Sequence, residues 1–229
     1  MRPDRTINSD YDQTNFSVIP ASGTVALSIQ CAELVGHESR LAERSLQHLA
    51  SLRDLRIAHC KLAALPRHSL AGLQRLANLS VHTHPEGGEA GGLGLGELSL
   101  EVEAGALADL RGLSRLDLSY SGLWRLPDQE LCGLQSLVHL NLSHNSVKDV
   151  KDAGLGGDQC TLSSLASLDL SHNQLQQVPG AGLQSAPGLL INNQISQVHD
   201  GALDGLPDIK TLDLSGNQII SFPLNNNKA

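Results

Sequence analysis

The chain has 229 residues, a formal net charge of −8 and a pI of about 5.6. This acidic balance disfavours nucleic acid or anionic lipid as the main partner. Leucine makes up about a fifth of the residues and aromatic residues only 2%, a composition that suits a narrow leucine-packed stack better than a globule anchored on aromatic side chains. No run of 18 apolar residues is present, so the sequence predicts no membrane span.

Residues 1–24 form a polar lead-in without a repeat pattern. The first residues lack the apolar core of a signal peptide, so on this feature alone the chain resembles a cytosolic protein. Residues 25–51 are predicted to form an irregular first turn, which begins with the strand-like stretch Val25–Cys31. Its second part, Ser39–Leu52, has leucine spacings that suit a short helix on the outer side of the fold.

Residues 52–223 contain a repeat with a period of about 24 residues. Its consensus is L-x-x-L-x-L-x-x-N/C-x-L, which is typical of leucine-rich repeats. A glycine- and glutamate-rich loop at residues 82–97 is expected to protrude from the array. Five segments superpose without gaps: Leu52–Pro66, Leu113–Pro127, Leu137–Val150, Leu165–Pro179 and Ile209–Pro223.

Two irregularities stand near the end of the array. Residues 183–198 hold a shortened repeat in which Ser185 and Gly188 replace two consensus leucines, so a weakened turn is expected there. The chain stops in mid-repeat, and neither end has a cysteine-rich cap of the kind that terminal repeats usually need. These features predict a fragment, a short isoform or an incomplete gene model.

The consensus has a direct structural meaning. Each L-x-L is a short strand whose leucines point inward, because side chains alternate between the faces of a strand. Successive strands then stack in parallel, which gives an α/β leucine-rich repeat solenoid, curved like a horseshoe. The parallel sheet lies on its concave face, and the convex side is irregular or short-helical. An amide column at the turns is expected to bond buried backbone groups; its members are Asn145, Asn173, Asn193 and Asn217.

The residues between the two strand leucines are expected to line the concave face. Three of them are acidic, which would suit a cationic ligand, although a solvated surface explains the charge as well. Asn141 occupies the same position in its repeat, and a glycan there would direct ligands to a flank, the convex side or the glycine-rich loop. The possible ligand-face residues are Arg56, Asp117, Asp169 and Asp213.

The four cysteines fall into two pairs, Cys31 with Cys60 and Cys132 with Cys160. Each pair is separated by about one repeat, within the reach that a disulfide requires. An ordinary thiol remains an alternative for Cys60, which stands at the Asn/Cys position of the consensus. The spacing lacks the C-x-x-C and paired histidines of a zinc site.

Three N-x-S/T sequons begin at Asn15, Asn78 and Asn141 and are candidate glycosylation sites. They carry modest weight, because such triplets arise by chance and the repeat itself tends to generate N-L-S. If they are used, the chain folds in the secretory pathway.

Other patterns predict no chemistry. The stretch Gly91–Glu97 lacks the Lys-Ser/Thr and the strand–helix setting of a phosphate loop. His144 and His172 would be neighbours in stacked repeats, where a solvated ladder is favoured over a metal or pH-sensing site. We therefore expect no catalytic, cofactor-binding or metal-binding residues, and no enzyme.

Several segments outside the consensus resemble the N-terminal ectodomain of arthropod Toll receptors of the long-ectodomain subgroup. They are Asp12–Ala21, Ala26–Glu33, Ile57–His84, Leu100–Leu107 and Arg115–Leu134. Residues around Cys31, Cys60 and Trp124 give the resemblance its specificity.

This resemblance implies an extracellular or cell-surface receptor of innate immune or developmental signalling. Its array would bind a protein ligand, such as a cystine-knot cytokine, or another receptor ectodomain, and signal through a membrane span and a TIR domain. The resemblance also implies that the four cysteines are disulfide partners and that Asn78 and Asn141 carry glycans. The span, the TIR domain, the signal peptide and the upstream cysteine pair are missing here, so the chain is not expected to signal alone. The competing hypothesis is a cytosolic leucine-rich adaptor or scaffold.

Overall fold

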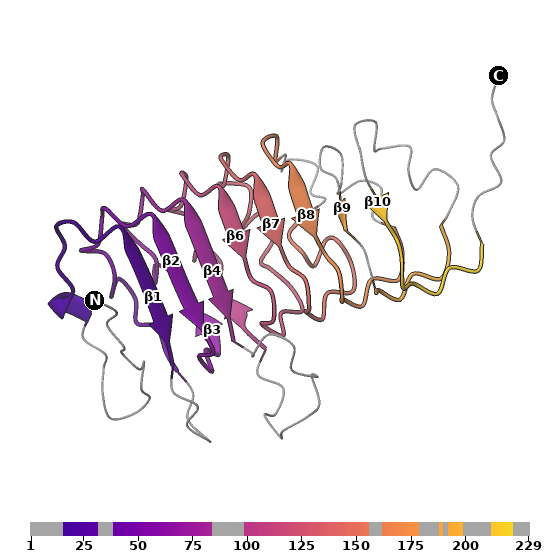
Figure 1. The fold of residues 1–229 in the computed structure, drawn as a ribbon, viewed down its shortest axis with the longest axis horizontal. Coiled ribbons are helices and arrows are strands. Elements are labelled where there is room, and N and C mark those ends of the chain that lie inside the picture. Colours follow the sequence, from indigo (N-terminus) through magenta and orange to yellow (C-terminus); the bar gives the residue numbers. More distant parts are fainter. Residues whose placement is uncertain are drawn as a thin grey trace.

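A computed structural model describes residues 16–31, 39–83, 99–155, 162–178, 188–189, 192–198 and 212–221. These residues form coils that follow one another along an elongated body, with one strand per coil on the same side (Figure 1). The described elements are the 3-10 helix η1 (Phe16–Val18) and the strands β1 (Ala26–Gln30), β2 (Asp54–Ala58), β3 (Ala64–Leu65), β4 (Asn78–His82), β5 (Glu101–Val102), β6 (Arg115–Asp117), β7 (His139–Asn141), β8 (Ser167–Asp169), β9 (Gly188–Leu189) and β10 (Leu212–Asp213).

The main sheet has eight strands in the order β1-β2-β4-β6-β7-β8-β9-β10, and every pair is parallel. The first consensus leucines of the strands are in register: Leu27, Leu55, Leu79, Leu116, Leu140 and Leu168. Each of them is at most 6% exposed, whereas the residues on either side face solvent to varying degrees. The predicted leucine-rich repeat solenoid is therefore confirmed.

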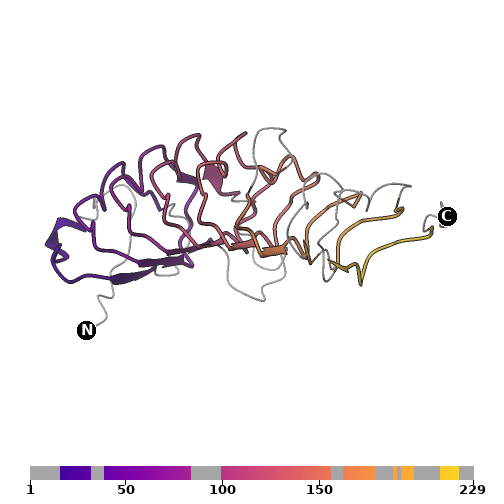
Figure 2. The same cartoon turned by 90° about the horizontal axis from the view of Figure 1, so that it is seen from above.

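The side opposite the sheet is irregular, one of the two forms expected for it. Figure 2 shows the strands along one edge and the connecting turns arching over the other. A second, short parallel ladder joins β3 to β5, and isolated bridges link Gln177 to Gln197 and Gln197 to Ser221.

The short helix expected within Ser39–Leu52 is not found, and no α-helix occurs in any of the described segments. A run of turns replaces it, in which the amide of Leu49 bonds the carbonyl of Leu46 and the amide of Leu52 bonds that of Leu49. These three leucines are fully buried. Leucines three residues apart thus mark successive tight turns here, each of which buries one side chain.

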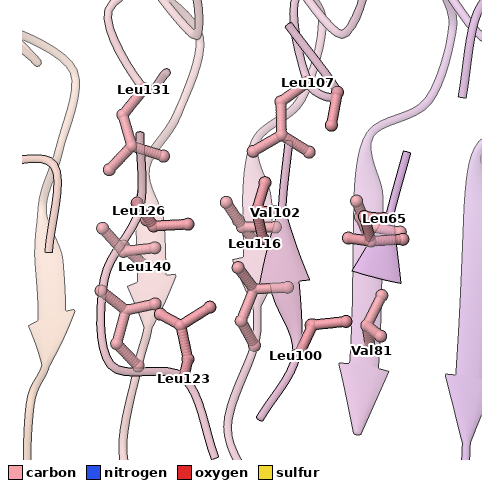
Figure 3. Close-up of a cluster of buried hydrophobic side chains, with 14 of the residues drawn as sticks. Leu65, Val81, Leu100, Val102, Leu107, Leu116, Leu123, Leu126, Leu131 and Leu140 are labelled. Carbon is pink, nitrogen blue, oxygen red and sulfur yellow. The ribbon is translucent and has the colours of Figure 1, made fainter. Parts of the chain in front are cut away.

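The core is a continuous layer of aliphatic side chains between the sheet and the turns. Figure 3 shows strand residues such as Leu116 and Leu140 together with turn residues such as Leu126 and Leu131. Burying one such leucine contributes about 2 kcal/mol. Because these residues come from adjacent coils, the stability of each coil depends on its neighbours.

The two ends of the described array differ in packing. Phe16 of η1 belongs to the segment expected to be a polar lead-in, yet it is only 5% exposed and joins the core at the first coil. At the other end, Leu212 and Leu214 are only partly buried. Strand β4 extends through His82, the first residue of the predicted glycine-rich loop; residues 84–97 of that loop are not among those described.

Candidate functional site

The concave face of the sheet brings the predicted ligand-face residues onto one row. They occupy the second exposed position of their strands, and the parallel register aligns them. In strand order the row is Ser28, Arg56, Ser80, Asp117, Asn141 and Asp169, and Asp213 has the same position in β10. Neighbouring members are about 4.8 Å apart, the spacing of paired strands.

A groove of about 850 Å³ crosses the first four strands of this sheet, β1, β2, β4 and β6. Its lining includes the basic residues Arg56 and Arg115 and the acidic residues Asp54 and Asp117. Arg115 and Asp54 are not among the predicted ligand-face residues, because they precede the first strand leucine and the prediction covers only the residue between the two leucines. The residue before the first leucine faces the same side, since its side chain is two positions away along the strand.

The acidic residues of the row also stabilise the turns that follow their strands. The Oδ1 atoms of Asp117, Asn141, Asp169 and Asp213 each accept the backbone N–H of the serine two positions later, at 2.9–3.0 Å. This is the Asx turn, a local motif in which Asp and Asn are interchangeable. Such bonds from Ser215 hold the pKa of Asp213 below its usual value. These four side chains therefore have a structural role whether or not a ligand binds.

His82 and Asp117 form a polar cluster with two serines at the ends of β4 and β6. The Nε2 atom of His82 lies 3.2 Å from Asp117 Oδ1 and 3.2 Å from the hydroxyls of Ser80 and Ser119. Burial raises the pKa of Asp117, but the hydrogen bonds from His82 and Ser119 outweigh it and lower the pKa overall. Serine and aspartate share one ring nitrogen here, so this is not the arrangement of a catalytic triad, in which they use opposite nitrogens.

The turn asparagines bond backbone groups of two adjacent coils. Asn145 donates from Nδ2 to the carbonyls of Leu118, Leu142 and Ser143 at 2.9–3.2 Å. Its Oδ1 accepts the amides of Ser121 and Leu123 at 3.2 and 2.9 Å.

Three further asparagines act in the same way. Asn173 accepts the amide of Val147, Asn193 that of Leu175 and Asn217 that of Ile195. Their Nδ2 groups donate to carbonyls at the ends of nearby strands. We refer to Asn145, Asn173, Asn193 and Asn217 as the asparagine column. It satisfies backbone groups of the turns that are shielded from water.

Ser121 continues this column into the preceding coil, although it lacks an amide. It is fully buried, and its hydroxyl donates to the carbonyl of Val81 at 2.8 Å. The sequence did not predict this role, because serine has no place in the consensus.

Stacked rings follow the column along the strand ends. The rings of Tyr120 and His144 have centroids 4.1 Å apart, those of His144 and His172 are 4.0 Å apart, and both pairs are nearly parallel. All three residues have positive φ, between 52° and 56°. We call them the ring ladder. Burial and the charge of His172 lower the pKa of His144 more than Asp169 raises it.

The ring ladder is unsuited to a metal. Parallel rings 4.0 Å apart direct their nitrogen lone pairs side by side instead of toward one point. Within the described segments, no group of three or more His, Cys, Asp or Glu residues is placed to hold a metal ion. In the same segments, no helix is long and apolar enough to cross a bilayer.

The cysteines and sequons occupy distinct places. Cys31 and Cys60 form a disulfide with Cα atoms 4.8 Å apart, which joins the first two coils. Cys132 is also disulfide-bonded. Asn78 and Asn141 lie on the concave sheet, in β4 and β7. Cys160, Asn15 and the stretch Gly91–Glu97 are outside the residues that the structure describes.

Comparison with known sequences connects these features to two groups of proteins. The family model described as "Leucine rich repeat" matches residues 98–147 and 163–219. Toll-like receptor 7 of Drosophila melanogaster is 34% identical over 143 residues, which is 62% of this chain and 9% of the receptor. Fibromodulin of Oryctolagus cuniculus is 36% identical over 108 residues, which is 47% of this chain and 61% of that protein.

Two solved structures share the fold. The TLR13–ssRNA13 complex aligns with a TM-score of 0.66 at 21% identity, over 88% of this chain and 26% of that chain. Human 5T4, also described as Wnt-activated inhibitory factor 1 or trophoblast glycoprotein, aligns with a TM-score of 0.53 at 27% identity, over 75% of this chain and 61% of that chain.

The coil geometry, the asparagine column and these matches show that the chain has the leucine-rich repeat fold. The resemblance to arthropod Toll receptors is confirmed by the similarity to the Drosophila receptor. The chain spans about a tenth of that receptor and about three fifths of fibromodulin.

Proposed function

We propose that the chain is a protein-binding, extracellular leucine-rich repeat module of a Toll-type receptor. Its partner is a protein ligand, such as a cystine-knot cytokine, or the ectodomain of another receptor, in innate immune or developmental signalling. The observation that carries the proposal is the 34% identity to the Drosophila Toll-like receptor over 143 residues. That stretch is much longer than a single repeat.

The disulfides support an extracellular setting over a cytosolic adaptor. The Cys31–Cys60 bond joins two coils, and Cys132 is bonded as well. Disulfides persist in oxidising compartments and are reduced in the cytosol. In a cytosolic scaffold these cysteines would be thiols, and the first two coils would lack their cross-link.

The charge of the concave face supports a protein partner over RNA. The groove presents Arg56 and Arg115 beside Asp54 and Asp117, while the row beyond it carries Asp169 and Asp213. Nucleic-acid binding depends on a basic surface that neutralises phosphates. This chain has a net charge of −8, and its likeness to the TLR13–ssRNA13 complex is one of fold.

The proposal is tested by secreting the chain with a supplied leader and measuring its binding by surface plasmon resonance. The analytes are purified cystine-knot cytokines, receptor ectodomains and a single-stranded RNA. We expect saturable binding to one of the proteins and none to RNA at physiological salt. A matched pair of variants is Asp169→Lys, which reverses a charge on the sheet, and Lys148→Asp, which reverses a charge in the turn after β7. Failure to form disulfides during secretion, or binding to RNA alone, would contradict the proposal.

A further inference from the structure

Histidines gather on the concave side of the solenoid. The described segments contain seven histidines, of which five lie on the concave strands or in the turns that immediately follow them. These five are His59, His82, His139, His144 and His172. The other two, His48 and His68, are in turns on the opposite side. Protonation of the histidines therefore changes the charge of the concave face far more than that of the convex side.

Ring contacts join three of these histidines along the ends of the strands. The Nε2 atom of His82 lies 3.2 Å from Asp117, and the ring of His82 meets that of Tyr120 edge-on, with centroids 6.4 Å apart. Tyr120 begins the ring ladder, which continues through His144 to His172. The sequence predicts only His144 and His172 as neighbours, whereas the structure connects His82 to them. We call His82, Tyr120, His144 and His172 the histidine edge.

The concave face beside the histidine edge has more acidic than basic residues. At the outward-facing positions of β1, β2, β4, β6, β7, β8 and β10, the structure places four aspartates and two arginines, and no lysine or glutamate. They are Asp54, Arg56, Arg115, Asp117, Asp169 and Asp213. With neutral histidines these strands therefore carry two more negative than positive charges, and protonation of the three edge histidines is enough to reverse the sign.

Acidic groups stand beside both parts of the histidine edge. Asp117 of β6 contacts His82, and Asp169 of β8 acts on His144. Burial and then the charge of His172 lower the pKa of His144, while Asp169 opposes them. These two carboxylates and the phenol of the tyrosine in the edge are the titratable partners that the structure shows for its histidines. A cation bound to Asp169 is therefore within electrostatic reach of His144.

We propose that the concave sheet binds a basic segment of the protein partner at neutral pH and releases it when the histidine edge takes up protons in an acidic compartment. This inference rests on the proposed extracellular function; it names the chemistry of the partner and the control of its binding. The partner's lysines or arginines bond the carboxylates of Asp117, Asp169 and Asp213, because each carboxylate in an Asx turn can accept further hydrogen bonds. Release needs no covalent step, since each imidazole takes up one proton.

The partner and the protons oppose each other at this surface. A lysine of the partner at Asp169 and a proton on His144 repel each other, and the repulsion is stronger at a partly buried site than in bulk water. The effect is reciprocal: protonation weakens the binding of the partner, and the bound partner makes His144 harder to protonate. A histidine far from the carboxylates would titrate independently of the partner.

The test measures the binding of a basic probe to the secreted, disulfide-bonded chain. The probe is a short peptide of alternating lysine and glycine, and the corresponding glutamate peptide controls for charge. Surface plasmon resonance at about pH 7.4 and about pH 5, at one salt concentration, should show the affinity for the lysine peptide fall at least about tenfold in acid. Proton NMR should show the titration midpoint of His144 move to lower pH when the lysine peptide is added.

A first pair of variants assigns the pH dependence to the ladder. His144→Asn/His172→Asn removes both ladder histidines, and Asn192 shows that asparagine adopts the positive φ of this position. This double variant should bind the lysine peptide at neutral pH like the wild type and lose most of the pH dependence. His68→Gln, on the convex side, should retain the pH dependence; Gln129 shows that glutamine adopts a similar positive φ.

A second pair concerns the carboxylates. Asp169→Asn keeps the Asx turn, as Asn141 does at the same position, and should weaken binding of the lysine peptide at neutral pH several-fold. Asp128→Asn, at an exposed turn, should leave the binding unchanged. This comparison separates the concave carboxylate from the general acidity of the chain, whose net charge is −8.

Three results would overturn this inference: no binding of the lysine peptide at neutral pH, equal affinity in acid, or an unchanged pH dependence in the double histidine variant. Binding of single-stranded RNA or of the glutamate peptide in acid would also overturn it, because the reversed charge would then serve an anionic ligand. All of these results leave the proposed function standing, since that is decided by disulfide formation and by binding of a protein at neutral pH. Protein that is retained in cells with reduced cysteines would instead contradict the proposed function.

Discussion

The two ends of the solenoid close the same turn by different chemistry. In the first two coils the chain is joined by the Cys31–Cys60 disulfide. From the coil of β7 onward, the same part of the turn is occupied by the asparagine column. Ser121 stands between the two regions and has neither a thiol nor an amide.

The disulfide and the asparagine column stabilise their coils in different ways. A disulfide acts mainly by restricting the unfolded chain. A buried asparagine acts in the folded chain, where it satisfies backbone groups that would otherwise lack partners. The first two coils are therefore held by a covalent link at the turn. The coils from β7 onward depend on hydrogen bonds from asparagine side chains to the backbone.

The largest loss of stability is expected at Asn145, whose side-chain amide makes five hydrogen bonds to the backbone. Asn145→Ala removes five hydrogen bonds to the backbone and leaves the bonded groups buried. We expect the free energy of unfolding to fall by about 4 kcal/mol, since each unsatisfied buried group costs roughly 1–3 kcal/mol. Equilibrium unfolding in urea measures the loss.

Asn217→Ala is the control for this substitution. Asn217 performs the same role in the last described coil but is only partly buried, so water can replace its bonds. A loss of about 1 kcal/mol is expected. Equal losses for the two variants would show that burial does not set the strength of the column.

The disulfide comes next in magnitude. The double variant Cys31→Ala/Cys60→Ala opens a cross-link between residues 29 positions apart. The expected loss is about 3 kcal/mol. Thermal unfolding with and without reductant gives the control: the reductant should lower the midpoint of the wild type more than that of the variant. Identical midpoints for wild type and variant would show that the disulfide does not stabilise the folded chain.

Ser121 tests the junction between the two regions. Ser121→Ala removes the hydroxyl that donates a hydrogen bond to the carbonyl of Val81, at a fully buried position. We expect a loss of about 1–2 kcal/mol. Ser164→Ala removes a bond of the same kind, to the carbonyl of Gln135, at an exposed site and should cost close to nothing. A neutral Ser121→Ala would mean that the junction needs no side-chain bond.

The smallest effect concerns pH. The pKa of His144 is lowered, chiefly by burial and then by the charge of His172, so the unfolded chain takes up this proton first as the pH falls below 6.5. Stability should therefore decline slightly as the pH falls from 6.5 through the folded pKa of His144. His144→Tyr is expected to flatten this decline, and Tyr120 shows that tyrosine adopts the same positive φ. Melting temperatures measured between about pH 5 and pH 7 check it; an unchanged slope would contradict it.

Asp117 is expected to make stability depend on pH in a second, more acidic range. Its pKa is lowered despite burial, because His82 and Ser119 bond the carboxylate. The stability it contributes is present above about pH 3.8 and is lost as the pH falls through the folded pKa. Acid unfolding of Asp117→Asn should therefore show a shallower dependence below pH 4. Asp128→Asn, at an exposed turn, is the control.

The sequence predicts those parts of the fold that recur at fixed positions in the repeat. The strand leucines and the turn asparagines recur at fixed offsets, so their roles and the parallel stacking can be predicted. The turn of Ser121 departs from the consensus, so the sequence does not predict that its hydroxyl donates a hydrogen bond to the carbonyl of Val81. The ring ladder depends on positive φ at Tyr120, His144 and His172, which no local pattern reveals for such residues.

The outer side and the groove were less predictable for physical reasons. Leucine spacings in Ser39–Leu52 fit either a helix or consecutive turns, and the need to return within one coil selects the turns. The groove residue Arg115 lies outside the L-x-L triplet; alternation along the strand gives its outward direction, but its place beside Asn78 in the groove requires the strand register.

Hydrogen exchange at single amides tests the central claim most directly, namely that side chains shared between coils satisfy the turns. The amide of Val147 belongs to no strand, and its bond to Asn173 Oδ1, at 3.0 Å, comes from the following coil. We predict that Val147 exchanges as slowly as Leu140 in β7 and that Asn173→Ala accelerates Val147 far more than Leu27 in the distant β1. Exchange of Val147 in the wild-type chain at the rate of an unprotected amide would contradict the account.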